Sequence, residues 1–106
     1  MKKDGSWAHL MKICQDDKDC LEKFRAVMQE ELPTETEGLH MATKAQDLLA
    51  AAELVHKIKH KFALVEMKAA YQYALTYEVA LKEGDCSGAD TFVAYLELLH
   101  EFLGEY

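Results

Sequence analysis

The sequence predicts an all-α protein, an up-and-down antiparallel four-helix bundle with an extra N-terminal helix. Apolar residues recur at three- and four-residue steps along most of the 106 residues, and no segment alternates as a strand does. The single proline and the five glycines fall at apparent boundaries between these segments. The connections between them are short, so helices that follow one another in sequence are expected to be antiparallel neighbours.

Two helices and a shorter third are expected in the N-terminal half. Ser6 is a candidate cap for the first helix, and Asp16 or Asp17 for the second. Pro33 is expected to end the second helix, because the residue before a proline disfavours the α conformation. The third helix is expected to continue from there toward Asp47. The spacing alone allows Asp47 either to break that helix or to lie inside it.

The C-terminal half carries the clearest amphipathic pattern. A helix from about Asp47 has one apolar stripe, made of Leu48, Ala51, Val55, Ile58, Phe62 and Val65. The next helix is expected from about Glu66 to Glu83, and a turn at Gly84 precedes a last helix that reaches Leu103. A chain of this length is expected to form one domain, residues 1–106, around a single core.

Composition argues against several classes of partner. The net charge is −7, from 19 acidic and 12 basic residues, so the surface repels phosphate backbones and anionic lipid. No apolar run is long enough to cross a bilayer, and no apolar segment follows the charged start as in a secretory signal. We therefore expect a cytoplasmic monomer that binds neither nucleic acid nor membrane.

The three cysteines, Cys14, Cys20 and Cys86, are expected to be free thiols. Their number is odd and no Cys-x-x-Cys motif is present, so buried small apolar roles are favoured. Cys14 and Cys20 can approach each other only if the chain turns at residues 15–17.

His56 is the candidate functional residue. It lies one position off the apolar stripe. Glu53 is three residues before it, Lys59 three residues after it and His60 four residues after it. Those spacings place the four polar side chains on one patch of helix surface. Lysines gather beside this patch, namely Lys57, Lys61 and Lys68. The pattern indicates a docking surface with a reactive imidazole, and the alternative is an ordinary solvated helix face.

The segment around His56 resembles the histidine-containing phosphotransfer (HPt) family, whose motif is His-x-x-Lys-Gly on a helix of a bundle. His56 and Lys59 match the histidine and the lysine. Two family glycines are replaced here. The one that follows the lysine is His60, and the one that opens the next helix is Glu66.

The resemblance extends beyond the motif to about residues 20–103. Asp47 stands where the family has an aspartate before the histidine helix, which favours a break in the chain there. Residues 77–85 are similar to the family pattern Leu-Glu…Arg-x-Gly-Asp, which closes the next helix. The implied fold is an HPt-like helical domain.

The resemblance implies a role in a multistep two-component phosphorelay. His56 would accept a phosphoryl group from a receiver aspartate and pass it on, and Lys59 would help to neutralise the phosphoryl oxygens. The implied partners are receiver domains of hybrid histidine kinases or response regulators. The receiver would bring Mg²⁺, so no cofactor is expected on this chain. The face expected to contact the partner consists of Leu49, Ala52, Glu53, Lys57, His60 and Ala63.

Two alternative functions also involve His56. Glu53-x-x-His56 and Glu97-x-x-His100, with Glu30 or Glu31 and Glu66 or Glu78 added, resemble the ligand set of ferritin-like di-iron proteins, although both motifs lie off the core positions. The other alternative is an HPt-like adaptor or inhibitor that binds receivers without relaying. In that case the imidazole of His60 would obstruct the partner or hydrogen-bond the ring of His56.

Overall fold

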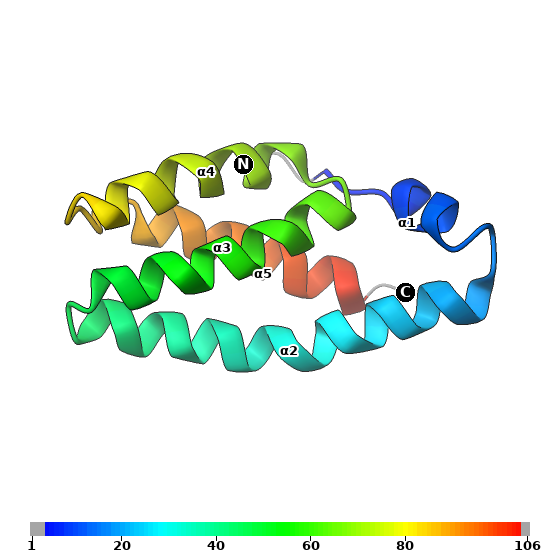
Figure 1. Cartoon of the computed structure of the whole chain (residues 1–106), viewed down its shortest axis with the longest axis horizontal. Helices are drawn as coiled ribbons and strands as arrows, with labels where there is room; N and C mark the ends of the chain where they lie inside the picture. The colour runs from blue at the N-terminus through cyan, green and yellow to red at the C-terminus, as the bar shows by residue number, and fades with distance from the viewer. Residues whose placement is uncertain (1–3, 105–106) are drawn as a thin grey trace.

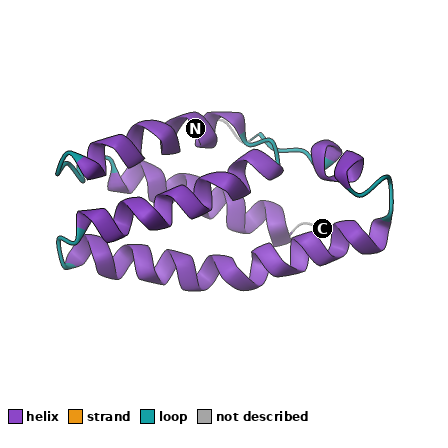
Figure 2. Ribbon diagram, in the orientation of Figure 1, coloured by secondary structure: helices purple, strands orange, loops and turns teal. Residues whose placement is uncertain are grey.

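The computed structural model describes residues 4–104, which form five α-helices and no strand (Figure 2). The helices are α1 (Ala8–Ile13), α2 (Lys18–Lys44), α3 (Leu48–Leu64), α4 (Lys68–Lys82) and α5 (Ala89–Gly104). The predicted all-helical class is confirmed. In Figure 1, α2 to α5 lie along the long axis with successive helices running in opposite directions, and α1 sits at one end. Within residues 4–104 no helix is both long enough and apolar enough to cross a membrane.

Helix α2 runs without a break through Pro33, so the predicted end of a helix at that position is wrong. The proline ring lies on the exposed side of α2, whereas Leu32 and Leu39 on the other side are buried in the core. Apolar residues on both sides of the proline therefore face the same core. We infer that their burial outweighs the missing hydrogen bond and the steric conflict of an interior proline.

Replacing Pro33 with alanine is expected to stabilise the protein by about 1 to 3 kcal/mol. Alanine restores an N–H that can donate to the carbonyl group of Gln29 one turn earlier, and it has the highest helix propensity. Urea unfolding monitored by circular dichroism measures the change, with the exposed neighbour Thr34→Ala as the matched control. A loss of stability in Pro33→Ala would show that α2 does not continue through this position in solution.

Aspartates begin the two longest helices. The Asp17 side chain accepts a hydrogen bond from the backbone N–H of Asp19 at 2.9 Å, so Asp17 rather than Asp16 caps α2. Gln46 turns the chain with a φ of 60°, and Asp47 then caps α3 by accepting from the N–H of Ala50 at 3.2 Å. The break favoured at Asp47 is confirmed, and it sets where α3 begins.

The core lies along the predicted apolar stripe of α3. Ala51, Val55, Ile58 and Phe62 are fully buried, and the Phe62 ring meets Phe92 of α5 edge to face at 6.0 Å between centroids. Helix α3 packs against both α2 and α4. This packing fixes the rotation of α3, and it leaves the positions just off the stripe at the surface.

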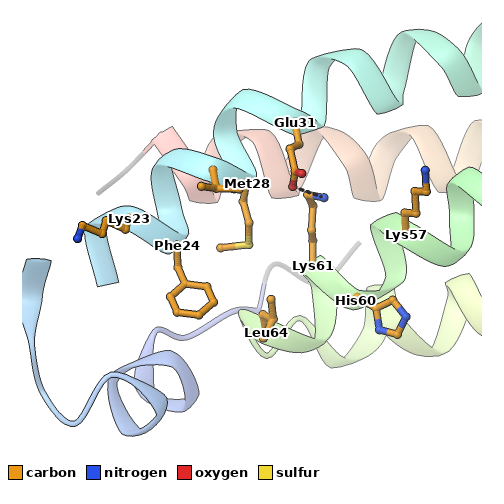
Figure 3. A pocket seen from close by; sticks show the side chains of 9 residues that line it. Lys23, Phe24, Met28, Glu31, Lys57, His60, Lys61 and Leu64 are labelled. Carbon is orange, nitrogen blue, oxygen red and sulfur yellow. Dashed lines mark ion pairs between the residues drawn. The ribbon is translucent and has the colours of Figure 1, made fainter. Parts of the chain in front are cut away.

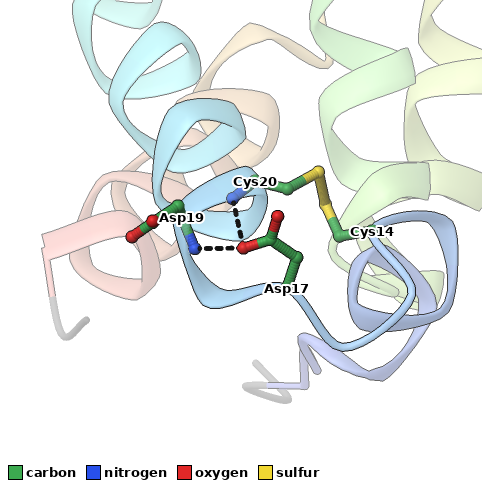
Figure 4. Close-up of a disulfide and its surroundings, with 4 residues drawn as sticks. All are labelled: Cys14, Asp17, Asp19 and Cys20. Carbon is green, nitrogen blue, oxygen red and sulfur yellow. Dashed lines mark hydrogen bonds between the residues drawn. A yellow bond between two sulfur atoms is a disulfide. The ribbon is translucent and has the colours of Figure 1, made fainter.

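Cys14 and Cys20 form a disulfide, which corrects the expectation of free thiols (Figure 4). Gln15 and Asp16 both adopt a positive φ, 52° and 62°, so the chain reverses within the short link between α1 and α2. This reversal brings the two cysteine Cα atoms to 5.6 Å, within the range that a disulfide spans. Cys86 is a free thiol, as expected.

Candidate functional site

His56 projects from the middle of α3 at the surface. Its side chain is 50% exposed, whereas Val55 beside it is fully buried. The position follows from the one-residue offset between His56 and the apolar stripe. The imidazole is therefore held on a rigid helix and is still open to a partner.

Glu78 of α4 is the main partner of the His56 ring. Its carboxylate oxygens lie 3.2 and 3.3 Å from Nδ1 of His56, and its side chain is only 10% exposed. The same carboxylate accepts from Lys59 Nζ at 2.9 Å and from Lys82 Nζ at 3.2 Å. One buried carboxylate thus connects the ring of His56 with two ammonium groups.

This environment keeps Glu78 ionised. Burial by itself raises the pKa of Glu78, but hydrogen bonds from the three neighbouring nitrogens outweigh it and lower that pKa to about 2. An ionised carboxylate can only accept hydrogen bonds. Lys59 Nζ also lies 3.2 Å from Nδ1 of His56, but it donates to Glu78 at the shorter distance of 2.9 Å. We therefore assign Nδ1 of His56 as a donor to both carboxylate oxygens of Glu78. The neutral ring then carries its proton on Nδ1 and its free lone pair on Nε2. Nε2 is the nitrogen available for chemistry.

His60 contacts this reactive nitrogen. The Nε2 atoms of His56 and His60 lie 3.3 Å apart, and the two rings meet edge to face with centroids 4.8 Å apart. Because Nε2 of His56 carries a lone pair, the hydrogen bond must be donated by Nε2–H of His60. The side chain of His60 therefore covers Nε2 of His56.

The lysines near His56 do not form the free basic patch that the sequence suggested. Lys61 points toward α2 and pairs with Glu35 at 2.8 Å and Glu31 at 3.2 Å. Lys59 is buried against Glu78. Lys57 is exposed beside His56, and Lys82 of α4 is 57% exposed on the other side of Glu78. The accessible positive charge comes from α4 as well as from α3.

The residues expected to contact a partner differ in their exposure to solvent. Leu49 is 67% exposed, and Ala63 is also exposed, as a contact surface requires. Ala52 is buried instead, and it lines a shallow hollow of about 400 Å³ in front of the imidazole. The other residues that line this hollow are Glu53, His56, Lys57, Glu78 and Lys82.

A second hollow, also of about 400 Å³, lies between α2 and α3 on the His60 side (Figure 3). Its apolar lining is Phe24, Val27, Met28 and Leu64, and its polar lining is Lys23, Glu31, Lys57, His60 and Lys61. Lys57 borders both hollows, so they adjoin on the surface. The sequence predicted a helix in this part of α2, but it did not place its residues beside His60.

The two Glu-x-x-His motifs are directed to different partners. His56 contacts Glu78 of α4, whereas Nε2 of His100 lies 3.3 Å from the hydroxyl of Thr36 of α2. Among residues 4–104, no three side chains of histidine, cysteine, aspartate or glutamate are grouped so that they could hold a metal ion. The structure therefore offers no observation in favour of a di-iron centre.

Comparison with family models, curated proteins and solved structures finds no match to this chain.

Proposed function

We propose that this chain is a histidine phosphotransfer protein, in which His56 accepts a phosphoryl group from a receiver aspartate and passes it to another. The observation that carries the proposal is the pairing of Nδ1 of His56 with the buried carboxylate of Glu78. That pairing selects the tautomer in which Nε2, on a half-exposed ring, is nucleophilic.

The transfer needs little from this chain beyond that geometry. Nε2 of His56 attacks the phosphorus of the receiver's aspartyl phosphate, so that an N–P bond forms. The bond between phosphorus and the aspartate oxygen breaks, and the carboxylate leaves with the electron pair. The imidazole keeps its proton on Nδ1 and becomes positive, and Glu78 stabilises that charge across 3.2 Å. Reversal of these steps on a second receiver passes the group on.

Positive charge for the phosphoryl oxygens comes from two sides of the ring. Lys59 Nζ lies 3.2 Å from Nδ1 of His56 but is paired with Glu78, so in this geometry it acts mainly by holding that carboxylate. Lys57 and Lys82 line the hollow in front of the ring and are exposed. We assign to them the direct neutralisation of the phosphoryl oxygens, as point charges.

Backbone geometry supports the HPt-like arrangement. Glu66, which replaces the glycine that opens the next helix in the family, adopts a φ of 56° between α3 and α4. Glycine takes up this left-handed region without the steric penalty of a Cβ atom, so a glycine in relatives at this position is physically reasonable. Asp47 caps α3, as the family pattern implies.

The proposed partner surface combines the hollow at His56 with the apolar hollow between α2 and α3. Val27 and Leu49 are 52% and 67% exposed, and they would be covered by a docked receiver. The proposed partners are receiver domains of hybrid kinases or response regulators, and this chain would bind them as a monomer. A cytoplasmic location also belongs to the proposal, and the Cys14–Cys20 disulfide weighs against it, because disulfides are rare there.

The direct test is incubation with a panel of phosphorylated receiver domains, followed by detection of acid-labile phosphate on this chain. We expect at least one receiver to label this chain. Removal of Mg²⁺ with a chelator should prevent the labelling, since the receiver supplies the ion. Binding of receivers without any label would favour the adaptor, and neither binding nor label would reject both functions.

The adaptor is kept as a second candidate because of one contact, the 3.3 Å hydrogen bond from His60 to the reactive nitrogen of His56. An incoming phosphorus atom must approach along the direction that His60 now occupies. If that hydrogen bond persists in the complex with a receiver, this chain binds receivers but does not relay.

Replacing His60 with glycine or alanine is expected to speed transfer to His56. Removal of the imidazole frees the lone pair, and misplacement of reacting groups can change rates about a hundredfold. His60→Ala keeps the helix intact, whereas His60→Gly is expected to lower its stability by about 1 kcal/mol or less. Label gained only in the variants would identify the wild type as an adaptor. Slower transfer in both variants would show that His60 assists the reaction.

A further inference from the structure

His56 and His60 are placed as a pair of metal ligands would be. They stand four residues apart on α3, so both rings project from the same face of one rigid helix. Both are exposed, and their Nε2 atoms converge to 3.3 Å. The other described histidines, His9, His40 and His100, have no second ring in contact. The convergence of two imidazole nitrogens at one exposed point is therefore specific to His56 and His60.

The separation of the two nitrogens fits a tetrahedral ion. Zn²⁺ binds imidazole nitrogen at about 2.0–2.1 Å, so two ligands at the tetrahedral angle lie about 3.3–3.4 Å apart. An octahedral ion with the same bond lengths would require about 2.9 Å. The observed 3.3 Å corresponds to the tetrahedral value without any movement of the helix.

The partner of His56 is also the one that a zinc ligand needs. A ligating histidine commonly donates its second ring N–H to a carboxylate, which fixes the tautomer and makes the ligating nitrogen more basic. Nδ1 of His56 has this partner in the buried carboxylate of Glu78, at 3.2 Å. Nε2 of His56 is thus already in the state that binds a metal.

From these contacts we propose that His56 and His60 form a two-histidine site for a divalent transition metal of the Zn²⁺ type. In the metal-free protein His60 donates its Nε2 proton to His56. On binding, that proton moves to Nδ1 of the same ring, whose residue is exposed, so two neutral rings present two lone pairs and no proton is released. Water completes the coordination in the hollow.

The site is distinct from a ferritin-like centre, because it uses His60 and needs no carboxylate ligand. It also does not depend on the phosphotransfer function. If both proposals hold, a bound ion occupies the nitrogen that would accept the phosphoryl group, so metal and phosphoryl transfer exclude each other. This exclusion would give the cell a way to silence His56 without changing the protein covalently.

The test is a titration of the untagged full chain with ZnCl₂ by isothermal calorimetry. We expect one ion per chain, and we expect both His56→Gln and His60→Gln to weaken binding at least about tenfold, since each removes one of two ligands. Glu78→Gln is expected to weaken it about tenfold through the lost carboxylate partner. His40→Gln and Cys86→Ser, which remove a lone imidazole and the free thiol, should leave the affinity unchanged.

Proton NMR supplies a second measurement. Zinc should shift the imidazole resonances of His56 and His60 together, and it should leave that of His40 in place. The proposal is overturned if wild type shows no binding up to about 1 mM zinc, or if His60→Gln binds as tightly as wild type. A chain that binds zinc but accepts no phosphate would reject the phosphotransfer function and leave the metal site standing.

Discussion

Replacing His56 with glutamine is expected to abolish phosphoryl labelling by receivers completely. Glutamine can still donate a hydrogen bond to the carboxylate of Glu78, but it offers no nucleophilic ring nitrogen. Because the side chain is half exposed and lies off the core, the fold should be unchanged. The measurement is acid-labile phosphate on the variant, with the helical circular-dichroism spectrum as the check on folding.

His100→Gln is the matched control for this substitution. His100 is also an exposed histidine on a helix, but its ring faces Thr36 rather than a carboxylate. The control should label like wild type. Label that persists on His56→Gln would place the phosphoryl group elsewhere, and His60 would be the first position to replace.

Replacing Glu78 with leucine is expected to cost about 3 kcal/mol of unfolding free energy, the largest loss among the polar residues of the site. The change removes the partner of Lys59, whose side chain is only 10% exposed, and a buried charge without a partner is strongly destabilising. Urea unfolding measures the loss, and the exposed Glu97→Leu on α5 is the matched control. A loss below about 0.5 kcal/mol would show that Lys59 reaches water without Glu78.

The contribution of Glu78 should also depend on pH. Its pKa is lowered from 4.5 to about 2 in the folded protein, so the stabilisation is fully present above pH 4.5 and is lost as the pH falls toward 2. We expect the pH-dependent stabilisation by Glu78 to be about 2 kcal/mol. This is less than the roughly 3 kcal/mol that corresponds to the whole pKa shift, because Lys82 is largely exposed and its interaction with Glu78 is screened by water. Between pH 4.5 and 2, the unfolding free energy of Glu78→Gln should therefore fall less steeply than that of wild type.

Several features of the site could be predicted from the sequence because they depend on local spacing. The three- and four-residue recurrence of apolar residues determines which face of α3 is buried, and it places His56 just outside that face. This burial pattern follows from the geometry of a single helix. The break at Asp47 is different, because spacing alone allowed Asp47 either to break a helix or to lie inside one, and only the HPt resemblance favoured the break that the structure shows.

Two other features were not predictable from local sequence signals. Pro33 carries a local signal to end a helix, but the burial of Leu32 and Leu39 in one core is the stronger effect. The Cys14–Cys20 disulfide depends on the positive φ of Gln15 and Asp16. Residues other than glycine rarely adopt this conformation, so the sequence does not predict it. Both expectations were therefore wrong, the first because core burial outweighs the local signal and the second because the residue types do not reveal the turn.

The sequence by itself determined a helical protein and the surface position of His56. The contact of His56 with His60 follows from their four-residue spacing on one helix, but only the tertiary structure decided which residue of another helix His56 contacts. Glu78 reaches Nδ1 because α4 packs beside α3 at one particular register, and a shift by one residue would turn that carboxylate away. The opposite directions of Lys59 and Lys61, toward α4 and α2, have the same origin. Register and rotation between helices are set by the packing of the whole core, and no short stretch of sequence encodes them.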